Sequence, residues 1–165
     1  MKKEKLKKII INLINFIIPY YNIDKKIYDL YRRARKNYLK GHNLLADYYI
    51  NKIYKKYCCI ISSKAEIGEN LKLPHPLGIV IGSGVKIGSN CWIYQNVTIG
   101  RKAEEVCKYP SIGDNVKIYS GAVLVGNIKI GDNAIIGANS FVMQDVPNNA
   151  IAVGSPARII QREKK

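Results

Sequence analysis

The chain has 165 residues and a formal net charge of +15, a length that suits one domain with a small appendage. Residues 1–57 carry a net charge of +11, and such a basic surface favours anionic partners, unless the abundant Lys, Ile, Asn and Tyr reflect a compositional bias of the source. The four cysteines include the adjacent pair Cys58 and Cys59 and have no CxxC spacing, which excludes a disulfide framework and a zinc-finger site and predicts reduced thiols in a cytoplasmic protein.

The chain starts with a basic head, KKEKLKK, followed by the apolar run IIINLINFII. This pattern is similar to a signal peptide but has no A-x-A cleavage site. Asn12 and Asn15 interrupt the run, which is shorter than the ~20 residues of a membrane-spanning helix. We expect residues 1–22 to form a helix that either packs on a partner or makes peripheral contact with the inner face of the membrane.

Apolar residues recur with a helical period from residue 24 to residue 57. In residues 24–41, Asp24 is the predicted N-cap, Gly41 ends the helix, and the apolar face consists of Ile27, Leu30, Tyr31 and Ala34. In residues 42–57, the predicted packing face consists of Leu44, Leu45, Tyr48, Tyr49 and Ile53. Residues 1–57 are therefore predicted to be a helical N-terminal segment.

The period becomes six residues after residue 58. Aliphatic residues open hexads at 67 and 73, then after a shift of two residues at 81, 87, 93 and 99, and again from 112 onward, after the interruption RKAEEVCKYPS. Hexapeptide repetition is the signature of a parallel β-helix. The first residue of each hexad fills the tube, and glycine suits the corners because it accepts unusual backbone angles. Residues 58–165 are predicted to form this β-helix domain, with Cys91 in its core.

Residues 60–160 resemble the hexapeptide-repeat acyltransferases, specifically their serine acetyltransferase-like branch. The stretches that carry the resemblance are KAEIGENLKLPHPLGIVIGSGVKIG, IYQNVTIG, YPSIGDNVKIYSGAVLVGNIKIGDNAIIGANSFV and VPNNAIAVGSPARII. The family implies a mainly β fold, a left-handed parallel β-helix, that transfers an acetyl group from acetyl-CoA to a hydroxyl without a metal. It also implies a homotrimer with each active site in a groove between neighbouring β-helices.

His75 lies between two prolines and matches the family's catalytic histidine. A hydroxyl is a poor nucleophile near neutral pH, and a neutral imidazole can accept its proton as it attacks the thioester carbonyl. Backbone N–H groups at the hexad corners are the expected donors to the resulting oxyanion. The alternative is a purely structural corner histidine. Where the family has an aspartate fifteen residues earlier, this chain has Ile60, so Glu66, Glu69 or a neighbouring subunit would have to orient the imidazole.

Five residues match the family's acetyl-CoA positions, namely Ser120, Gly121, Gly137, Ala138 and Arg158. The four small residues would let the pantetheine arm lie along the backbone, and Arg158 would pair with a phosphate. The alternatives are that the repeat itself requires the small residues and that Arg158 is a solvated tail residue.

The predicted acceptor-binding residues are Pro74, Gln95, Lys108 and Tyr109. Pro74, Lys108 and Tyr109 replace the aspartate, the basic residue and the histidine with which the serine-specific branch holds serine. Proline offers neither charge nor donor, whereas a tyrosine ring suits a pyranose face. We therefore expect acetylation of a saccharide hydroxyl, in a surface polysaccharide or its precursor, with serine O-acetyltransferase of cysteine biosynthesis as the alternative. His75 disfavours a third class, a non-enzymatic binder of nucleic acid or membrane, and no nucleic-acid partner is expected.

Overall fold

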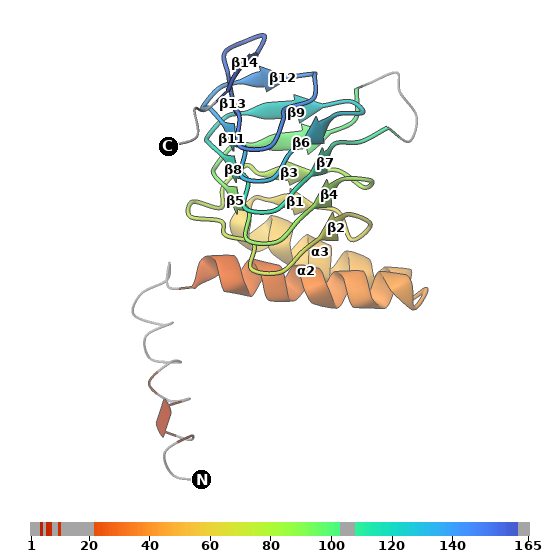
Figure 1. Ribbon diagram of the computed structural model, residues 1–165. Coiled ribbons are helices and arrows are strands. Elements are labelled where there is room, and N and C mark those ends of the chain that lie inside the picture. Colours follow the sequence, from red (N-terminus) through yellow and green to blue (C-terminus); the bar gives the residue numbers. More distant parts are fainter. Residues whose placement is uncertain (1–3, 5, 8–9, 11–21, 103–107, 162–165) are drawn as a thin grey trace.

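The computed structural model describes residues 4, 6, 7, 10, 22–102 and 108–161. Two helices, α2 (Ile23–Leu39) and α3 (Asn43–Tyr57), lead into a stack of short strands (Figure 1). The membrane or partner contact predicted for residues 1–22 lies almost wholly outside the described residues. Within the described part of the chain, no helix combines the length and the apolar character needed to cross a bilayer.

The strands form three sheets. Sheet A consists of β1 (Ile60–Ile61), β3 (Val80–Ile81), β6 (Thr98–Gly100), β9 (Val123–Val125) and β12 (Phe141–Val142). Sheet B consists of β2 (Glu66–Ile67), β4 (Lys86–Ile87), β7 (Ser111–Ile112) and β10 (Lys129–Ile130). Sheet C consists of β5 (Trp92–Ile93), β8 (Lys117–Ile118), β11 (Ile135–Ile136), β13 (Ile151–Val153) and β14 (Arg158–Ile160). The chain visits the sheets in the order A, B, C in each coil, and strands from successive coils pair in parallel. The predicted parallel β-helix is therefore confirmed.

The strand register locates the extra residues of the coils. Ile60 pairs with Val80, twenty positions later, whereas Val80 pairs with Thr98, eighteen positions later. The two extra residues of the first coil lie in the loop 73–79, which contains His75. Thr98 pairs with Val123, twenty-five positions later, and the longer connection here is the segment 101–110. Both irregularities are thus loops that leave the strand stack intact.

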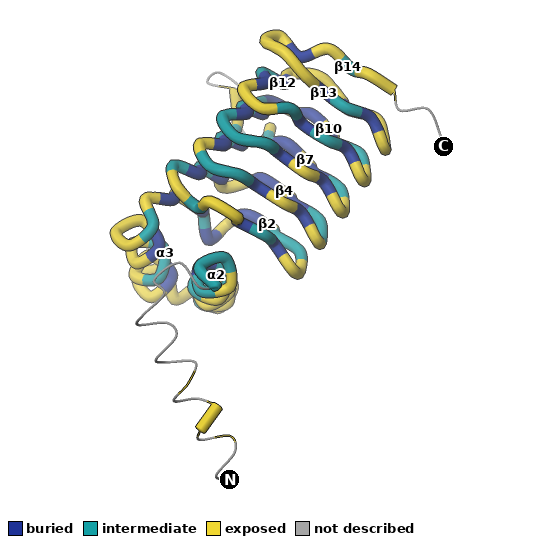
Figure 2. Tube along the Cα trace, turned by 90° about the vertical axis from the view of Figure 1, so that its left-hand side faces the viewer, coloured by how far each residue is buried: buried dark blue, intermediate teal, exposed yellow. Residues whose placement is uncertain are grey.

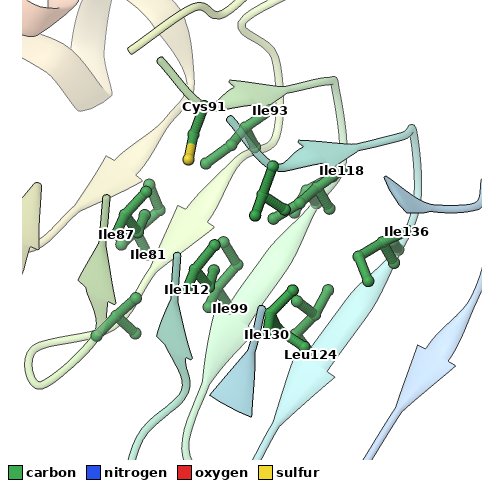
Figure 3. Close-up of a cluster of buried hydrophobic side chains, with 14 of the residues drawn as sticks. Ile81, Ile87, Cys91, Ile93, Ile99, Ile112, Ile118, Leu124, Ile130 and Ile136 are labelled. Carbon is green, nitrogen blue, oxygen red and sulfur yellow. The ribbon is translucent and has the colours of Figure 1, made fainter. Parts of the chain in front are cut away.

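The core is a column of aliphatic side chains inside the tube (Figure 3). Buried and exposed residues alternate along each coil (Figure 2), so the second residue of a strand such as Ile87 or Ile118 points inward. Burying a side chain of this size contributes ~1.5–3 kcal/mol. Cys91 is completely buried in this column, as predicted, and desolvation raises the pKa of its thiol to about 11.

Glycine takes left-handed backbone angles at the turn from sheet C to sheet A, as the sequence suggested, where Gly78 and Gly121 have φ of 66° and 70°. At the corner between sheets B and C, positive φ angles of 57–61° belong to asparagines, namely Asn70, Asn90, Asn115, Asn133 and Asn149. The preceding glycines are required by close approach between coils. A Cβ on Gly68 would lie 2.7 Å from the backbone carbon of Gly88, and one on Gly88 would lie 2.7 Å from that of Gly113. Asparagine takes the left-handed conformation more readily than most side chains.

Helix α2 covers the open edge of the first coil with its apolar face, as predicted. The Tyr31 hydroxyl donates to the carbonyl of Ala65 at 2.7 Å and accepts from the N–H of Ile67 at 3.2 Å. The Tyr28 hydroxyl donates to the carbonyl of Gly68 at 2.7 Å. These bonds satisfy backbone groups beside β2, the edge strand of sheet B, and so protect an edge that would otherwise invite pairing.

Two details of the helices differ from the prediction. Asn22, and not Asp24, is the N-cap of α2, and the Asp24 carboxylate lies 3.7 Å from the ammonium of Lys72. The buried residues of α3 are Ala46 and Ile53, whereas Leu44 is 88 % exposed. The prediction was therefore right for Ile53 and wrong for Leu44, Leu45 and Tyr48, which are exposed, because α3 turns the small residue Ala46 inward instead.

Candidate functional site

Seven of the predicted site residues lie on one edge of the β-helix, the turn from sheet C to sheet A, which we call the C–A corner (residues 73–79, 94–97, 119–122 and 137–140). These are Pro74, His75, Gln95, Ser120, Gly121, Gly137 and Ala138. Backbone hydrogen bonds hold successive turns in register. The N–H of Gly121 donates to the carbonyl of Gln95 at 3.0 Å, and the N–H of Asn139 donates to that of Ser120 at 2.9 Å. The repeat therefore aligns residues far apart in sequence.

His75 occupies the first coil of this corner. The preceding Leu73 is buried in the tube, which anchors the loop, whereas the imidazole is exposed. The carbonyl of His75 accepts from the N–H of Leu77 at 2.9 Å, and this tight turn holds the loop beyond the histidine. Pro74 is exposed beside it. A side chain held at its base and open at its tip can meet a substrate.

No carboxylate of the described residues forms an ion pair with His75. Glu66 lies on sheet B, where its carboxylate is 3.8 Å from the Arg35 guanidinium and 3.5 Å from the Lys86 ammonium. Glu69 lies at the corner between sheets B and C, and Ile60 is an outward residue of β1. Of the orienting groups expected from the sequence, neither glutamate serves within one chain.

Gln95, one coil beyond His75, has an unusual side chain. Its Oε1 atom is buried and has no hydrogen-bond partner among the described residues. An unsatisfied buried polar group costs about 1–3 kcal/mol, so such an atom is favourably placed to receive a donor from a ligand.

A stacked aromatic row extends from His75 and was not predicted. The rings of Tyr94 and Tyr119 stack with centroids 5.0 Å apart, and the His75 ring lies 6.3 Å from that of Tyr94. The signal in the sequence is the dipeptide IY in the hexads IYQNVT and IYSGAV, which lie in consecutive coils. Because both tyrosines follow a strand of sheet C directly, the register stacks them on one edge.

Beyond Tyr119 the corner carries small residues. Gly121 has a φ of 70°, which favours glycine, and a Cβ on Gly137 would lie 3.0 Å from Val153 Cγ2, so the fold itself favours a small residue at both positions. Val153 pairs with Arg158 across β13 and β14, which places Arg158 just past the last coil on the same edge. The Arg158 side chain is exposed. Small residues followed by a cation suit a long, thin ligand that ends in phosphates.

Lys108 and Tyr109 lie elsewhere. They end the segment that leaves the turn from sheet A to sheet B, which we call the A–B corner, and the Tyr109 ring covers Gly84 there so closely that a Cβ on Gly84 would overlap it. Within one chain the structure does not bring them to His75. The described residues also contain no group of three potential metal ligands.

Known proteins share these repeats and this fold. Residues 109–144 match the family described as bacterial transferase hexapeptide (six repeats). The chain is 48 % identical over 100 residues to serine acetyltransferases of Staphylococcus aureus strain N315 and Staphylococcus epidermidis strain ATCC 12228, covering 60 % of this chain and 47 % of theirs. It thus spans about half the length of the curated relatives it matches.

Solved structures give the same result. Soybean serine acetyltransferase complexed with serine superposes with a TM-score of 0.79 at 36 % identity, covering 81 % of this chain and 56 % of that one. The Neisseria gonorrhoeae enzyme gives 0.80 at 36 % identity, covering 84 % and 54 %. A serine acetyltransferase complex with CoA gives 0.76 at 35 % identity, covering 81 % and 55 %. The predicted fold class, a left-handed parallel β-helix behind α-helices, is confirmed.

Proposed function

We propose that this chain, a hexapeptide-repeat protein of the serine acetyltransferase-like type, transfers an acetyl group from acetyl-CoA to a hydroxyl, with His75 as the general base. The acceptor favoured by the comparisons is L-serine, because the relatives are named serine acetyltransferases and one neighbouring structure holds serine. The observation that carries the proposal is the alignment of His75 with the predicted acetyl-CoA residues along one edge of the β-helix.

The chemistry is a direct transfer. The neutral imidazole of His75 accepts the hydroxyl proton while the hydroxyl oxygen bonds to the thioester carbonyl carbon. The carbonyl oxygen becomes an oxyanion, and the N–H groups of Gln95 and Ser120, which meet no acceptor within the described part of the chain, are candidate donors. When the intermediate collapses, the carbon–sulfur bond breaks, and the imidazolium returns its proton to the thiolate of CoA.

The corner suits acetyl-CoA as the substrate, and a neighbouring structure holds CoA. The pantetheine arm would lie over Ser120, Gly121, Gly137 and Ala138, with a phosphate at Arg158. Three coil steps of about 4.8 Å separate the turns that begin near His75 and Gly137, so an extended ligand parallel to the axis fits better than a compact one.

The orphaned Gln95 Oε1 atom supports serine. The sequence offered no partner for the ammonium group of serine, because Pro74 stands in the aspartate position. A buried amide oxygen without a partner can accept a hydrogen bond from an ammonium group. Lys108 of a neighbouring chain would meet the carboxylate.

A trimer would bring that lysine to the site. The outward row of sheet A is largely apolar and in register, namely Ile60, Val80, Thr98, Val123 and Phe141. The outward row of sheet B is polar, namely Glu66, Lys86, Ser111 and Lys129. An apolar outer face favours contact with a second copy. We infer a threefold assembly in which the A–B corner of one chain lies against the C–A corner of the next.

A saccharide hydroxyl is the second candidate acceptor. The stack of Tyr94 and Tyr119 beside His75 offers an aromatic surface of the kind that carries sugar rings. The comparisons support serine better, and the aromatic stack is the observation in favour of a sugar.

The test is release of CoA from acetyl-CoA in the presence of L-serine, nucleotide sugars or oligosaccharides, with His75→Ala as the control. We expect turnover of L-serine with a KM within about 1 μM–1 mM. Turnover only with saccharides would replace the acceptor and keep the mechanism. Absence of His75-dependent turnover with every acceptor would refute the proposed function.

A further inference from the structure

The two helices α2 and α3 form a strongly basic end of the molecule. The helices lie under the first coil (Figure 1), and Figure 2 shows their far side exposed. Residues 22–57 contain ten lysines and arginines and three aspartates, a net charge of +7. The charge is therefore concentrated at one end of the molecule, opposite the C-terminal coil.

Large apolar side chains protrude at the turn between these helices. Leu39 is 66 % exposed, Leu44 is 88 % exposed, and Leu45 and Tyr48 are 51 % and 53 % exposed. All four lie within ten residues of one another, at the end of α2 and in the first two turns of α3. We call them the apolar tip. Single exposed leucines are ordinary, but a cluster marks an interaction surface.

Cations surround the apolar tip. Lys36 and Lys40 lie on the last turns of α2, and Lys52 lies on α3, one turn beyond Tyr48. The Lys52 ammonium is 5.2 Å from the centre of the Tyr48 ring. Within the described part of the chain, none of these three lysines forms an ion pair. Their charge is thus available to a partner.

A groove continues this basic surface toward sheet B. It has a volume of about 1000 Å³ and lies between α2 and the strands β2 and β4. Arg32, Lys36, Leu39 and Lys40 line its α2 side together with Asp29, and Lys86 lines its sheet side beside Glu66. Anionic groups can enter this groove while apolar groups contact the apolar tip beside it. A lipid surface presents the same pair of groups, because its headgroups lie next to its acyl chains.

We propose that the apolar tip and its surrounding lysines dock on an anionic lipid surface. Exposed leucines supply insertion into the interface, and lysines attract acidic headgroups. A second copy on this face is disfavoured, because a two-fold contact would oppose two surfaces of the same charge. Nucleic acid is disfavoured, because leucines protrude where stacking aromatic rings would be needed.

The experiment is co-sedimentation of the full chain with vesicles of phosphatidylglycerol and phosphatidylcholine, compared with vesicles of phosphatidylcholine alone. We expect binding only to the anionic vesicles, and we expect it to fall as salt is raised. The Leu44→Ser/Leu45→Ser variant should bind at least about tenfold more weakly. The Lys36→Glu/Lys52→Glu variant should also lose binding and provides a second test if the leucine variant is poorly folded.

Two controls match these changes. Met143→Ser removes an apolar side chain that is 48 % exposed at the far end of the β-helix, and Lys117→Glu/Lys129→Glu makes the same charge change on outer strands; both should bind like the unchanged chain. Circular dichroism checks folding, and light scattering measures the mass of the assembly. Three outcomes would overturn the proposal: no binding of the unchanged chain to anionic vesicles, unchanged binding of both helix variants, or a smaller assembly in the leucine variant, which would assign the tip to a second copy.

Discussion

At the scale of single residues, the proposed site combines an exposed base with a buried, unsatisfied acceptor. His75 is anchored by its loop and has no carboxylate partner among the described residues of its own chain. Gln95 holds its amide oxygen buried and without a partner one coil away. In the free protein the His75 base is unused and the unsatisfied Gln95 oxygen is unfavourable. Both groups would be used once a hydroxyl substrate is bound.

Replacing His75 with alanine should lower turnover about 10²–10⁴-fold, because no other group at the corner can take the hydroxyl proton. Its exposure predicts an unchanged melting temperature. Steady-state CoA release and thermal unfolding measure the two effects. Turnover near that of the unchanged chain would remove His75 from the mechanism.

Replacing Gln95 with methionine keeps the length of the side chain and removes the orphaned oxygen. The free protein should be as stable or more stable, because an unsatisfied buried group is lost. The kcat/KM for the acceptor should fall about tenfold, since one hydrogen bond to the substrate is lost. Thermal melting and kinetics must move in this way together; a destabilised variant with normal kinetics would mean that Gln95 is structural.

At the scale of elements, α2 acts as a cap that ends the β-helix. Stacked coils leave backbone groups unpaired at the first coil, and the Tyr31 hydroxyl both donates to and accepts from these groups. Burial raises the pKa of that phenol to about 12. The hydroxyl therefore stays protonated in the fold and keeps its donor role at any physiological pH.

Tyr31→Phe should lower the free energy of unfolding by about 1–3 kcal/mol, because two buried backbone groups lose their partner. Tyr54→Phe is the matched control, since Tyr54 is 55 % exposed on α3, and should change stability little. Urea unfolding at neutral pH measures both. Equal free energies of unfolding for Tyr31→Phe and the unchanged chain would contradict this role, because water would then replace the hydroxyl without loss of stability.

The same phenol predicts a dependence on alkaline pH. A tyrosine ordinarily titrates near pH 10, and the folded value is about 12. Above pH 10 the unfolded chain releases the proton more readily than the fold, so this part of the stability is complete below pH 10 and is lost as pH rises toward 12. The stability difference between the unchanged chain and Tyr31→Phe should therefore shrink in this window. A difference that stays constant would contradict the pKa.

At the scale of the whole molecule, the separation of the two corners is the main feature. His75 lies on the C–A corner, while Lys108 ends the segment on the A–B corner of the same chain. A site that uses both must therefore be shared between chains, and the largely apolar outer row of sheet A is a suitable face for that contact.

Light scattering should give three times the chain mass. Mixing two weakly active variants should restore part of the activity. His75→Ala and Lys108→Glu chains, each weakly active, should recover about one quarter of full activity when co-assembled in equal amounts, because one site in four then has both intact residues. Each variant assembled alone is the control. An active monomer, or mixed trimers without recovery, would show that no site is shared in this way.

The repeat, the column of buried aliphatic residues and the position of His75 could all be predicted from the sequence alone. A six-residue period predicts a parallel β-helix, because every hexad must return an aliphatic residue such as Ile87 or Ile118 to the tube. The family resemblance could place the site residues of the C–A corner, because a strict period puts matching positions of successive coils above one another. The exposed face of α3 was not determined, because apolar residues occur around most of that helix and packing alone chose Ala46.

Which side chains meet across the edges of the β-helix became known from the three-dimensional fold. It brought Tyr94 and Tyr119 into a stack, left Gln95 Oε1 without a partner and placed Tyr109 against Gly84, away from His75. At the corner between sheets B and C, it also assigned the left-handed conformation to asparagine and the close contacts between coils to glycine. These contacts depend on the distances between neighbouring coils. A repeat pattern specifies the order of the coils, but it does not specify which side chains of neighbouring coils touch each other.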